Sequence, residues 1–180
     1  MNYRLEKLNR MMSLSNIVLV LAGTTTALMA GLFYAWSCSV NLGLAKLSDE
    51  GYLTAMQEIN RAILNPVFFV GFFGALVLLP LSAYLHYGQP LQLKFWLLVA
   101  AALCYIIGTF GVTIFGNVPL NNALDVFDLK SATAEAMRAQ RIGFEATWNS
   151  LNTVRAVTST LAIVLIIIAC LYPDGVQTRN

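Results

Sequence analysis

The sequence predicts an all-α membrane protein: a four-transmembrane-helix bundle with two longer loops on the outer side, the second containing a short extramembrane helix. Of its 180 residues, 58% are hydrophobic and only 11% are charged, whereas soluble domains average about 25% charged residues. Four runs without Lys, Arg, Asp or Glu each reach the roughly 18 residues that a spanning helix needs. These runs cover residues 11–45, 62–93, 95–124 and 156–173.

Within these runs we expect four spans in one integral membrane domain, 1–180. Aromatic residues are enriched where a helix meets the membrane interface, and Trp36, Tyr84, Trp96 and Tyr172 stand near the ends of the runs. Pro66 fits the first turn of the second span, where no backbone N–H is needed. The predicted spans are therefore residues of about 14–36, 64–85, 95–115 and 154–172.

The charges before the first span predict the orientation. Arg4, Lys7 and Arg10 precede it, against Glu6 alone, and basic residues favour the cytoplasmic side. We expect a plasma (inner) membrane protein with cytoplasmic N- and C-termini, so that residues 37–63 and 116–153 form the outer loops. Basic residues also occur in those loops, and the whole-chain count therefore does not decide the orientation.

Small residues recur at helical spacing within the spans, and such stripes let helices approach closely in lipid. They are Gly23, Ala27, Gly31 and Ala35 in the first span, Gly71 and Ala75 in the second, and Ala100, Cys104 and Gly108 in the third. The stripes fit packing inside one bundle, and they fit a homo-oligomer face equally well. In the second outer loop, the segment SATAEAMRAQRIGF predicts a short helix, with Ser131 as its N-cap.

Polar side chains gather toward the predicted outer ends of the spans, in three clusters and one flanking segment. The clusters are Gln57, Asn60, Arg61 and Asn65 before span two; Asn117, Asn121 and Asn122 after span three; and Trp148, Asn152 and Arg155 before span four. Span one brings Tyr34 and Trp36 to the same level. Amides can satisfy backbone groups at a helix end. Alternatively, three clusters at one level can line a polar pocket in an apolar shell.

Arg155 allows three interpretations. An arginine in the first turn of a membrane helix is costly unless it is solvated or paired. It can extend outward to water, pair with Glu58 or Glu145, or bind an anionic oxygen of a ligand. Trp36 and Trp148 can likewise be interface anchors or stacking partners for a ligand.

Several functional classes are disfavoured. The net charge of +2 is too small to suggest nucleic-acid binding. His86 is the single histidine, the three cysteines (Cys38, Cys104 and Cys170) lie on different apolar runs, and no Gly-rich dinucleotide motif occurs. We therefore expect no metal and no cofactor.

The stretch GLFYAWSCSVNLGLAKLSDEGYLTAMQEINRAILNP, the stretch FGNVPLNNALD and the later Trp148, Asn152 and Arg155 together resemble the anthrone-oxygenase family of small four-helix membrane proteins. The resemblance covers about residues 27–156. It implies the fold and, for members named for the activity, oxidation of anthrones to anthraquinones by O2. The motif positions that match are Asn60, Asn65, Asn117, Pro119, Asn121, Trp148, Asn152 and Arg155.

If the chain is such an enzyme, its substrate is an apolar polycyclic aromatic molecule. Tyr34, Trp36, Phe115 and Trp148 are candidates to stack on the rings, with Asn60, Asn65 and Asn152 as further ligand-binding candidates. Asn117, Asn121 and Arg155 are candidates to hold an enolate oxygen, and Glu58 is the first candidate base, with Glu145 second. The alternative is a non-enzymatic membrane protein that grips a lipid or a membrane-protein partner.

Overall fold

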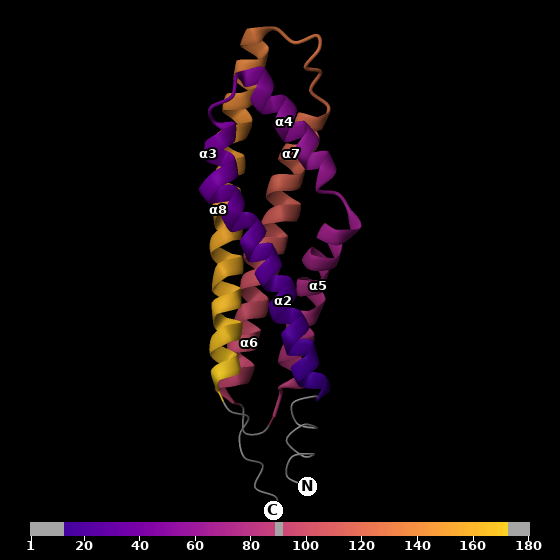
Figure 1. The fold of residues 1–180 in the computed structure, drawn as a ribbon, viewed down its shortest axis with the longest axis vertical. Helices are drawn as coiled ribbons and strands as arrows, with labels where there is room; N and C mark the ends of the chain where they lie inside the picture. The colour runs from indigo at the N-terminus through magenta and orange to yellow at the C-terminus, as the bar shows by residue number, and fades with distance from the viewer. Residues whose placement is uncertain (1–12, 89–91, 173–180) are drawn as a thin grey trace, which may run out of the picture.

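The computed structural model describes residues 13–88 and 92–172, and it confirms the all-α fold with four helical stretches long and apolar enough to span a membrane (Figure 1). Three of its elements, η1 to η3, are π-helical, with wider turns than an α-helix. The elements in chain order are α2 (Leu14–Ala35), η1 (Trp36–Val40), α3 (Asn41–Leu44), α4 (Asp49–Ala62), α5 (Pro66–Leu85), α6 (Leu93–Leu103), η2 (Cys104–Gly111), η3 (Thr113–Asn117), α7 (Val118–Asp125) and α8 (Ala134–Leu171).

The first and third spans continue past their predicted ends. The first helical stretch runs on to Leu44 and the third to Asp125. The asparagine-rich segment after residue 115 is therefore helical and not a turn. Pro119 does not interrupt it: the helix continues through Pro119, which is the second residue of α7 and follows the π-helical η3 directly.

The helix predicted in the second outer loop exists, but it is the first part of α8 and not a separate element. That helix has 38 residues, and Thr133 caps it by accepting a hydrogen bond from the Ala136 backbone N–H at 3.2 Å. The prediction of Ser131 as the cap was wrong. Its hydroxyl instead bonds to the Asp128 carboxylate at 2.8 Å, within the loop before the helix.

The four spans form a ring in which each contacts two neighbours. Helix α2 packs against α5 and α8, while α6 with η2 packs against α8 and α5. Two glycines mark the closest approaches. A Cβ on Gly108 would lie 2.3 Å from Thr158 Cγ2, and a Cβ on Gly71 would lie 2.7 Å from Met29 Cε. Only glycine fits such helix contacts without displacing the neighbour.

Outside the ring, α4 and α7 cover one end of the bundle together with the first part of α8. A second, smaller apolar core fills this cap, and it contains Tyr52, Leu53, Met56, Leu124, Phe144 and Trp148. Gln57 fastens α4 to α7, because its Nε2 donates to the carbonyl oxygens of Leu124 and Phe127 at 2.8 and 3.0 Å.

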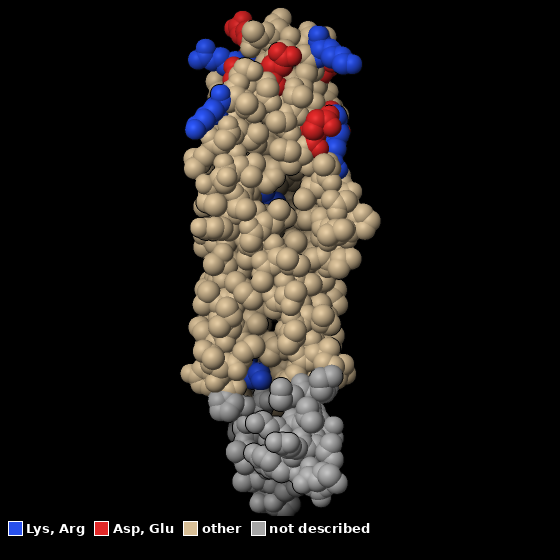
Figure 2. Space-filling view, viewed as in Figure 1, with Lys and Arg blue, Asp and Glu red and all other residues tan. Residues whose placement is uncertain are grey.

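The two long segments between spans extend from the same end of the bundle, whereas α2 begins and α8 ends at the opposite end (Figure 1). Charged side chains gather at the cap, above a broad band in which the only charge visible is basic surface inside a hollow (Figure 2). Less than half of the most apolar part of each span is buried inside the bundle, so the remainder forms the surface that lipid would cover. Arg4, Lys7 and Arg10, on which the predicted orientation rests, lie outside the described residues.

Candidate functional site

A pocket lies where the core of the spans meets the core of the cap. Its volume is about 140 Å³, and its walls come from all four spans and from α4. Phe33 and Phe72 belong to the core of the spans, and Trp148 belongs to that of the cap. Two wall segments are π-helical: Trp36 lies in η1, and Thr113 and Asn117 lie in η3. Such turns recur at functional sites.

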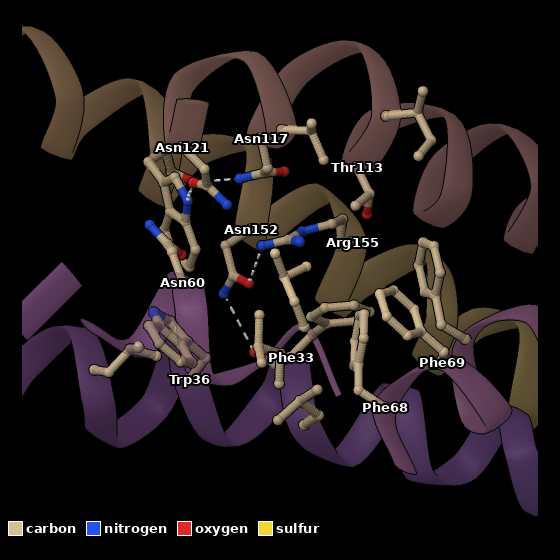
Figure 3. A pocket seen from close by; sticks show the side chains of 18 of the residues that line it. Phe33, Trp36, Asn60, Phe68, Phe69, Thr113, Asn117, Asn121, Asn152 and Arg155 are labelled. Carbon is tan, nitrogen blue, oxygen red and sulfur yellow. Dashed lines mark hydrogen bonds between the residues drawn. The ribbon is translucent and has the colours of Figure 1, made fainter. Parts of the chain in front are cut away.

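The polar side chains of three sequence clusters meet in this pocket (Figure 3). All three clusters contribute, but not with every predicted member. The polar lining consists of Trp36, Asn60, Thr113, Asn117, Asn121, Trp148, Asn152 and Arg155. Except for Thr113, each of these was a predicted site residue, and the predicted convergence at one level of the bundle is what the structure shows.

Arg155 is the only cation in the pocket lining, and its side chain is 6% exposed. The guanidinium carbon lies 4.5 Å from the centre of the Phe33 ring and 5.3 Å from that of the Trp148 ring. One amino group donates to Asn152 Oδ1 at 2.9 Å. Among the residues lining the pocket, all of them within the described parts of the chain, there is no carboxylate. Arg155 therefore does not extend outward to the surface, and it does not pair with Glu58 or Glu145.

Asn152 holds Arg155 in place. Its Nδ2 donates to Ser37 Oγ at 2.8 Å and to the Phe33 carbonyl at 3.3 Å, while its Oδ1 accepts from Arg155. These bonds use both ends of the amide and fix its orientation, with the oxygen toward the guanidinium. Asn152 is thus a positioning residue that links α8 to the end of α2.

Asn121 and Asn117 perform a similar task for Trp148. The indole Nε1–H donates to Asn121 Oδ1 at 2.8 Å, and Asn117 Nδ2 donates to the Trp148 carbonyl at 3.4 Å. Because α7 and η3 are bound to α8 in this way, the ring of Trp148 has a fixed orientation. It lies against Trp36, with ring centres 5.2 Å apart.

Four polar atoms of the pocket residues are buried and have no hydrogen-bond partner in the described structure: Trp36 Nε1, Asn60 Nδ2, Asn117 Oδ1 and Arg155 Nε. Burying a polar group without a partner is costly, and native structures contain few such groups. Four within one pocket indicate a site built to hydrogen-bond something that enters it.

The pocket opens sideways between apolar side chains of α5, of η3 and of the short segment before α5. Leu64, Phe69, Phe73 and Ile114 line it and are all exposed. A hollow is visible below the charged end, with basic surface inside it (Figure 2). Since α5 and η3 belong to stretches long and apolar enough to span a membrane, this mouth opens on the apolar surface of the spans. A second cavity of about 150 Å³, lined by Arg61, Asn122 and Asp125, adjoins it on the side of the charged cap and shares Asn60 and Asn121 with it.

The structure places five candidate site residues outside the pocket. Glu58, the candidate base, is exposed and forms an ion pair with Arg61 at 3.0 Å. Asn65 caps α5 by accepting from the Phe68 N–H at 3.0 Å, which is the structural role that the sequence left open for such amides. Tyr34 and Phe115 are exposed on the surface of the spans. Glu145, the second candidate base, pairs with Arg141 at 2.7 Å.

Sequence reasoning missed Phe33, Phe68 and Phe72 as pocket residues. Phe33 lies directly before Tyr34 in the chain, but it points inward and is 4% exposed. One signal was available: Phe33 and Trp36 are separated by three residues and share a helix face, whereas Tyr34 is turned away from it.

The fold and the site together define an integral membrane protein whose four-helix bundle holds a polar-lined pocket that opens on the apolar surface of the spans. The family model for anthrone oxygenase matches residues 67–165, which is more than half of the chain, and the chain therefore belongs to the anthrone oxygenase family. Comparison with curated proteins and with solved structures gives no match. The matched residues include Asn117, Asn121, Trp148, Asn152 and Arg155.

Proposed function

We propose that this protein binds an apolar aromatic molecule bearing an anionic oxygen and oxidises it with O2. The observation that carries this proposal is Arg155: a buried guanidinium between two aromatic rings, with a free Nε–H and no carboxylate in the pocket lining. A buried charge is stabilised by an opposite charge in the same low-dielectric space. An enolate or phenolate oxygen supplies that charge, and the aromatic walls accept its ring.

The size of the pocket limits how such a molecule can lie. A cavity of about 150 Å³ holds a benzene-sized ligand, and this pocket encloses about 140 Å³. One ring therefore fits inside, and at least one further ring of a polycyclic ligand extends into the mouth beside Phe69 and Phe73. An apolar ligand of this kind partitions into lipid, which is where the mouth opens.

The reaction supported by family membership is the conversion of a benzylic CH2 group, opposite a ring ketone, into a second carbonyl. The carbon loses four electrons and both hydrogens, and O2 gains four electrons. One oxygen atom enters the new carbonyl, and the other leaves as water with the two hydrogens. Loss of the first proton gives an enolate, which is the electron-rich species that reacts with O2.

The contribution of the chain is to make that first proton loss easier. A guanidinium in a site shielded from water stabilises an oxyanion much more strongly than it would in bulk water. Arg155 thereby increases the acidity of the bound substrate, and Asn152 keeps the guanidinium aligned. Glu58 has no part in this proposal, because it lies on the exposed face of α4.

The direct test uses full-length protein in lipid nanodiscs with anthrone as the probe. O2 uptake and anthraquinone formation are followed together, with empty nanodiscs as the blank for spontaneous oxidation. We expect wild type to exceed the blank and Arg155→Met to match it. A wild-type rate equal to the blank would refute the oxidative role, and tight anthrone binding without turnover would favour the non-enzymatic alternative.

The proposal extends to placement in the cell: the cap faces outward from the plasma membrane, with both termini in the cytoplasm. Arg4, Lys7 and Arg10 support it, since basic residues before a first span favour the cytoplasmic side. Labelling of Cys38 in intact cells with a membrane-impermeant thiol reagent tests it, because Cys38 is exposed near the cap and Cys170 lies at the other end of the bundle. Labelling that depends on Cys170 and not on Cys38 would reverse the orientation.

A further inference from the structure

Two donors of the pocket lie apart from Arg155 and have no assigned task. Trp36 Nε1 and Asn60 Nδ2 are buried and unpartnered, and both side chains line the pocket. In Figure 3 they occupy the same end of the pocket, on the far side of Asn152 from Arg155. Both residues also lie outside residues 67–165 that match the family model, so the match carries no information about them.

The chemistry of these groups defines what they can bind. An indole N–H and a guanidinium N–H are donors only, so each requires an acceptor. Asn152 uses its amide on Ser37, Phe33 and Arg155, and Trp36 Nε1 makes no hydrogen bond to it. Trp148, the other indole of the pocket, already donates to Asn121. A ligand held by Arg155 alone would leave Trp36 and Asn60 buried without a partner.

We infer that Trp36 and Asn60 form a second oxygen-binding subsite, which hydrogen-bonds an acceptor oxygen on the part of the ligand opposite the oxygen held by Arg155. The ligand class is thus an apolar ring system with two oxygen acceptors on opposite sides. This inference rests on the proposed function and adds to it the position at which the second oxygen is recognised. When the CH2 group opposite the ketone becomes a carbonyl, its new oxygen meets the Trp36 and Asn60 donors.

The test compares three probes that differ by one oxygen each: anthracene with none, anthrone with one and 9,10-anthraquinone with two. Binding of the tritiated probes to full-length protein in nanodiscs is measured without O2, so that anthrone is not consumed. We expect wild type to bind anthrone more tightly than anthracene, and anthraquinone about ten-fold more tightly than anthrone, as one further hydrogen bond predicts.

Variants test which donor accounts for each difference in affinity between the probes. Trp36→Phe combined with Asn60→Leu is expected to bring anthraquinone within about two-fold of anthrone, while the preference for anthrone over anthracene persists. Arg155→Met should remove that preference instead. Trp96→Phe is the matched control, since Trp96 is exposed on α6 and does not line the pocket, and it should leave all three affinities unchanged. Each single variant, W36F and N60L, should remove part of the quinone preference.

Four results can be told apart. A quinone preference that vanishes in the double variant supports the subsite. A preference that survives in the double variant and in both single variants overturns it, and it leaves the role of Arg155 intact. Equal wild-type affinity for anthrone and anthraquinone also overturns it, needs no variant, and means that water satisfies these donors. Failure of all three probes to bind refutes the subsite and the proposed function together.

Discussion

Replacing Arg155 by methionine is expected to abolish oxyanion binding while changing the stability of the protein little. Methionine has a similar length and removes the charge. Three contacts are lost: the hydrogen bond to Asn152 Oδ1 at 2.9 Å and the two ring contacts at 4.5 and 5.3 Å. The substitution also removes a buried cation that has no carboxylate partner in the pocket lining.

The free-energy contributions that Arg155→Met removes nearly cancel in the stability of the fold. Leaving Asn152 Oδ1 buried without a donor costs about 1–3 kcal/mol, and loss of the cation–π contacts costs about 1–2 kcal/mol. Against this, a buried ion carries a desolvation penalty of several kcal/mol, which an apolar side chain does not. We therefore expect the free energy of unfolding to change by less than about 2 kcal/mol. A charge-assisted hydrogen bond to the ligand is worth about 1.5–3 kcal/mol, so affinity for anthrone should fall about 10- to 100-fold.

Two assays on the same nanodisc samples separate these effects: thermal unfolding for stability and tritiated anthrone for binding. Arg155→Lys is the informative companion, because it keeps the charge and loses the planar array of donors. Its affinity for anthrone should lie between those of wild type and Arg155→Met. If Arg155→Met unfolds readily while the folded fraction binds anthrone as wild type does, Arg155 is a structural tether and the reasoning is refuted.

Three further predictions concern packing, pH and capping. Gly108→Ala should destabilise the bundle by about 1–3 kcal/mol, because the new Cβ would lie 2.3 Å from Thr158 Cγ2. Gly31→Ala is the control and should not destabilise it, because a Cβ there meets nothing within 4 Å. Equal effects of the two variants on unfolding in detergent would contradict the close approach at Gly108. Burial, with a smaller contribution from Glu145, raises the pKa of Tyr52 in the cap. The phenol thus stays neutral when folded and ionises near pH 10 when unfolded, so stability should fall above about pH 10. Tyr52→Phe should lessen that fall, and an unchanged alkaline profile would show that Tyr52 does not contribute. Asn65→Ala should lower the free energy of unfolding by about 1 kcal/mol through loss of the α5 cap, whereas Asn65→Asp should keep the cap. Neither variant should alter the affinity for anthrone, and a change in that affinity would show that Asn65 contributes to the site.

The sequence predicted the fold well because the membrane permits few solutions. Charge-free runs of sufficient length must be helices, since backbone groups in lipid have to be satisfied within the segment. The ends of the spanning helices were less predictable. The chain continues as a helix past Trp36 and past Phe115, because neither serine nor asparagine forces a helix to stop. Pro119 in α7 resembles a turn signal in the sequence, although the helix continues through it to Asp125.

The site was predicted where spacing on one helix was informative, as for Asn152 and Arg155, three residues apart and bonded to each other. It was missed where facing depended on local helix geometry. Phe33 and Tyr34 are adjacent in α2, and adjacent residues of an α-helix point about 100° apart. Tyr34 faces outward and Phe33 inward, a distinction that aromatic character alone does not make.

Whether a residue serves as a base or in a structural contact also depends on spatial neighbours, which a linear sequence pattern does not identify. Glu58 lies two residues before Asn60 in the same helix, but residues at that spacing point to different sides. Asn60 therefore enters the pocket, while Glu58 turns outward and pairs with Arg61. With no carboxylate lining the described pocket, the pocket itself provides a cation, neutral donors and the neutral amide oxygen of Asn117, but no anionic base. Such a set of groups favours a substrate that is already acidic, which is the property of a CH2 group flanked by aromatic rings and conjugated to a ketone.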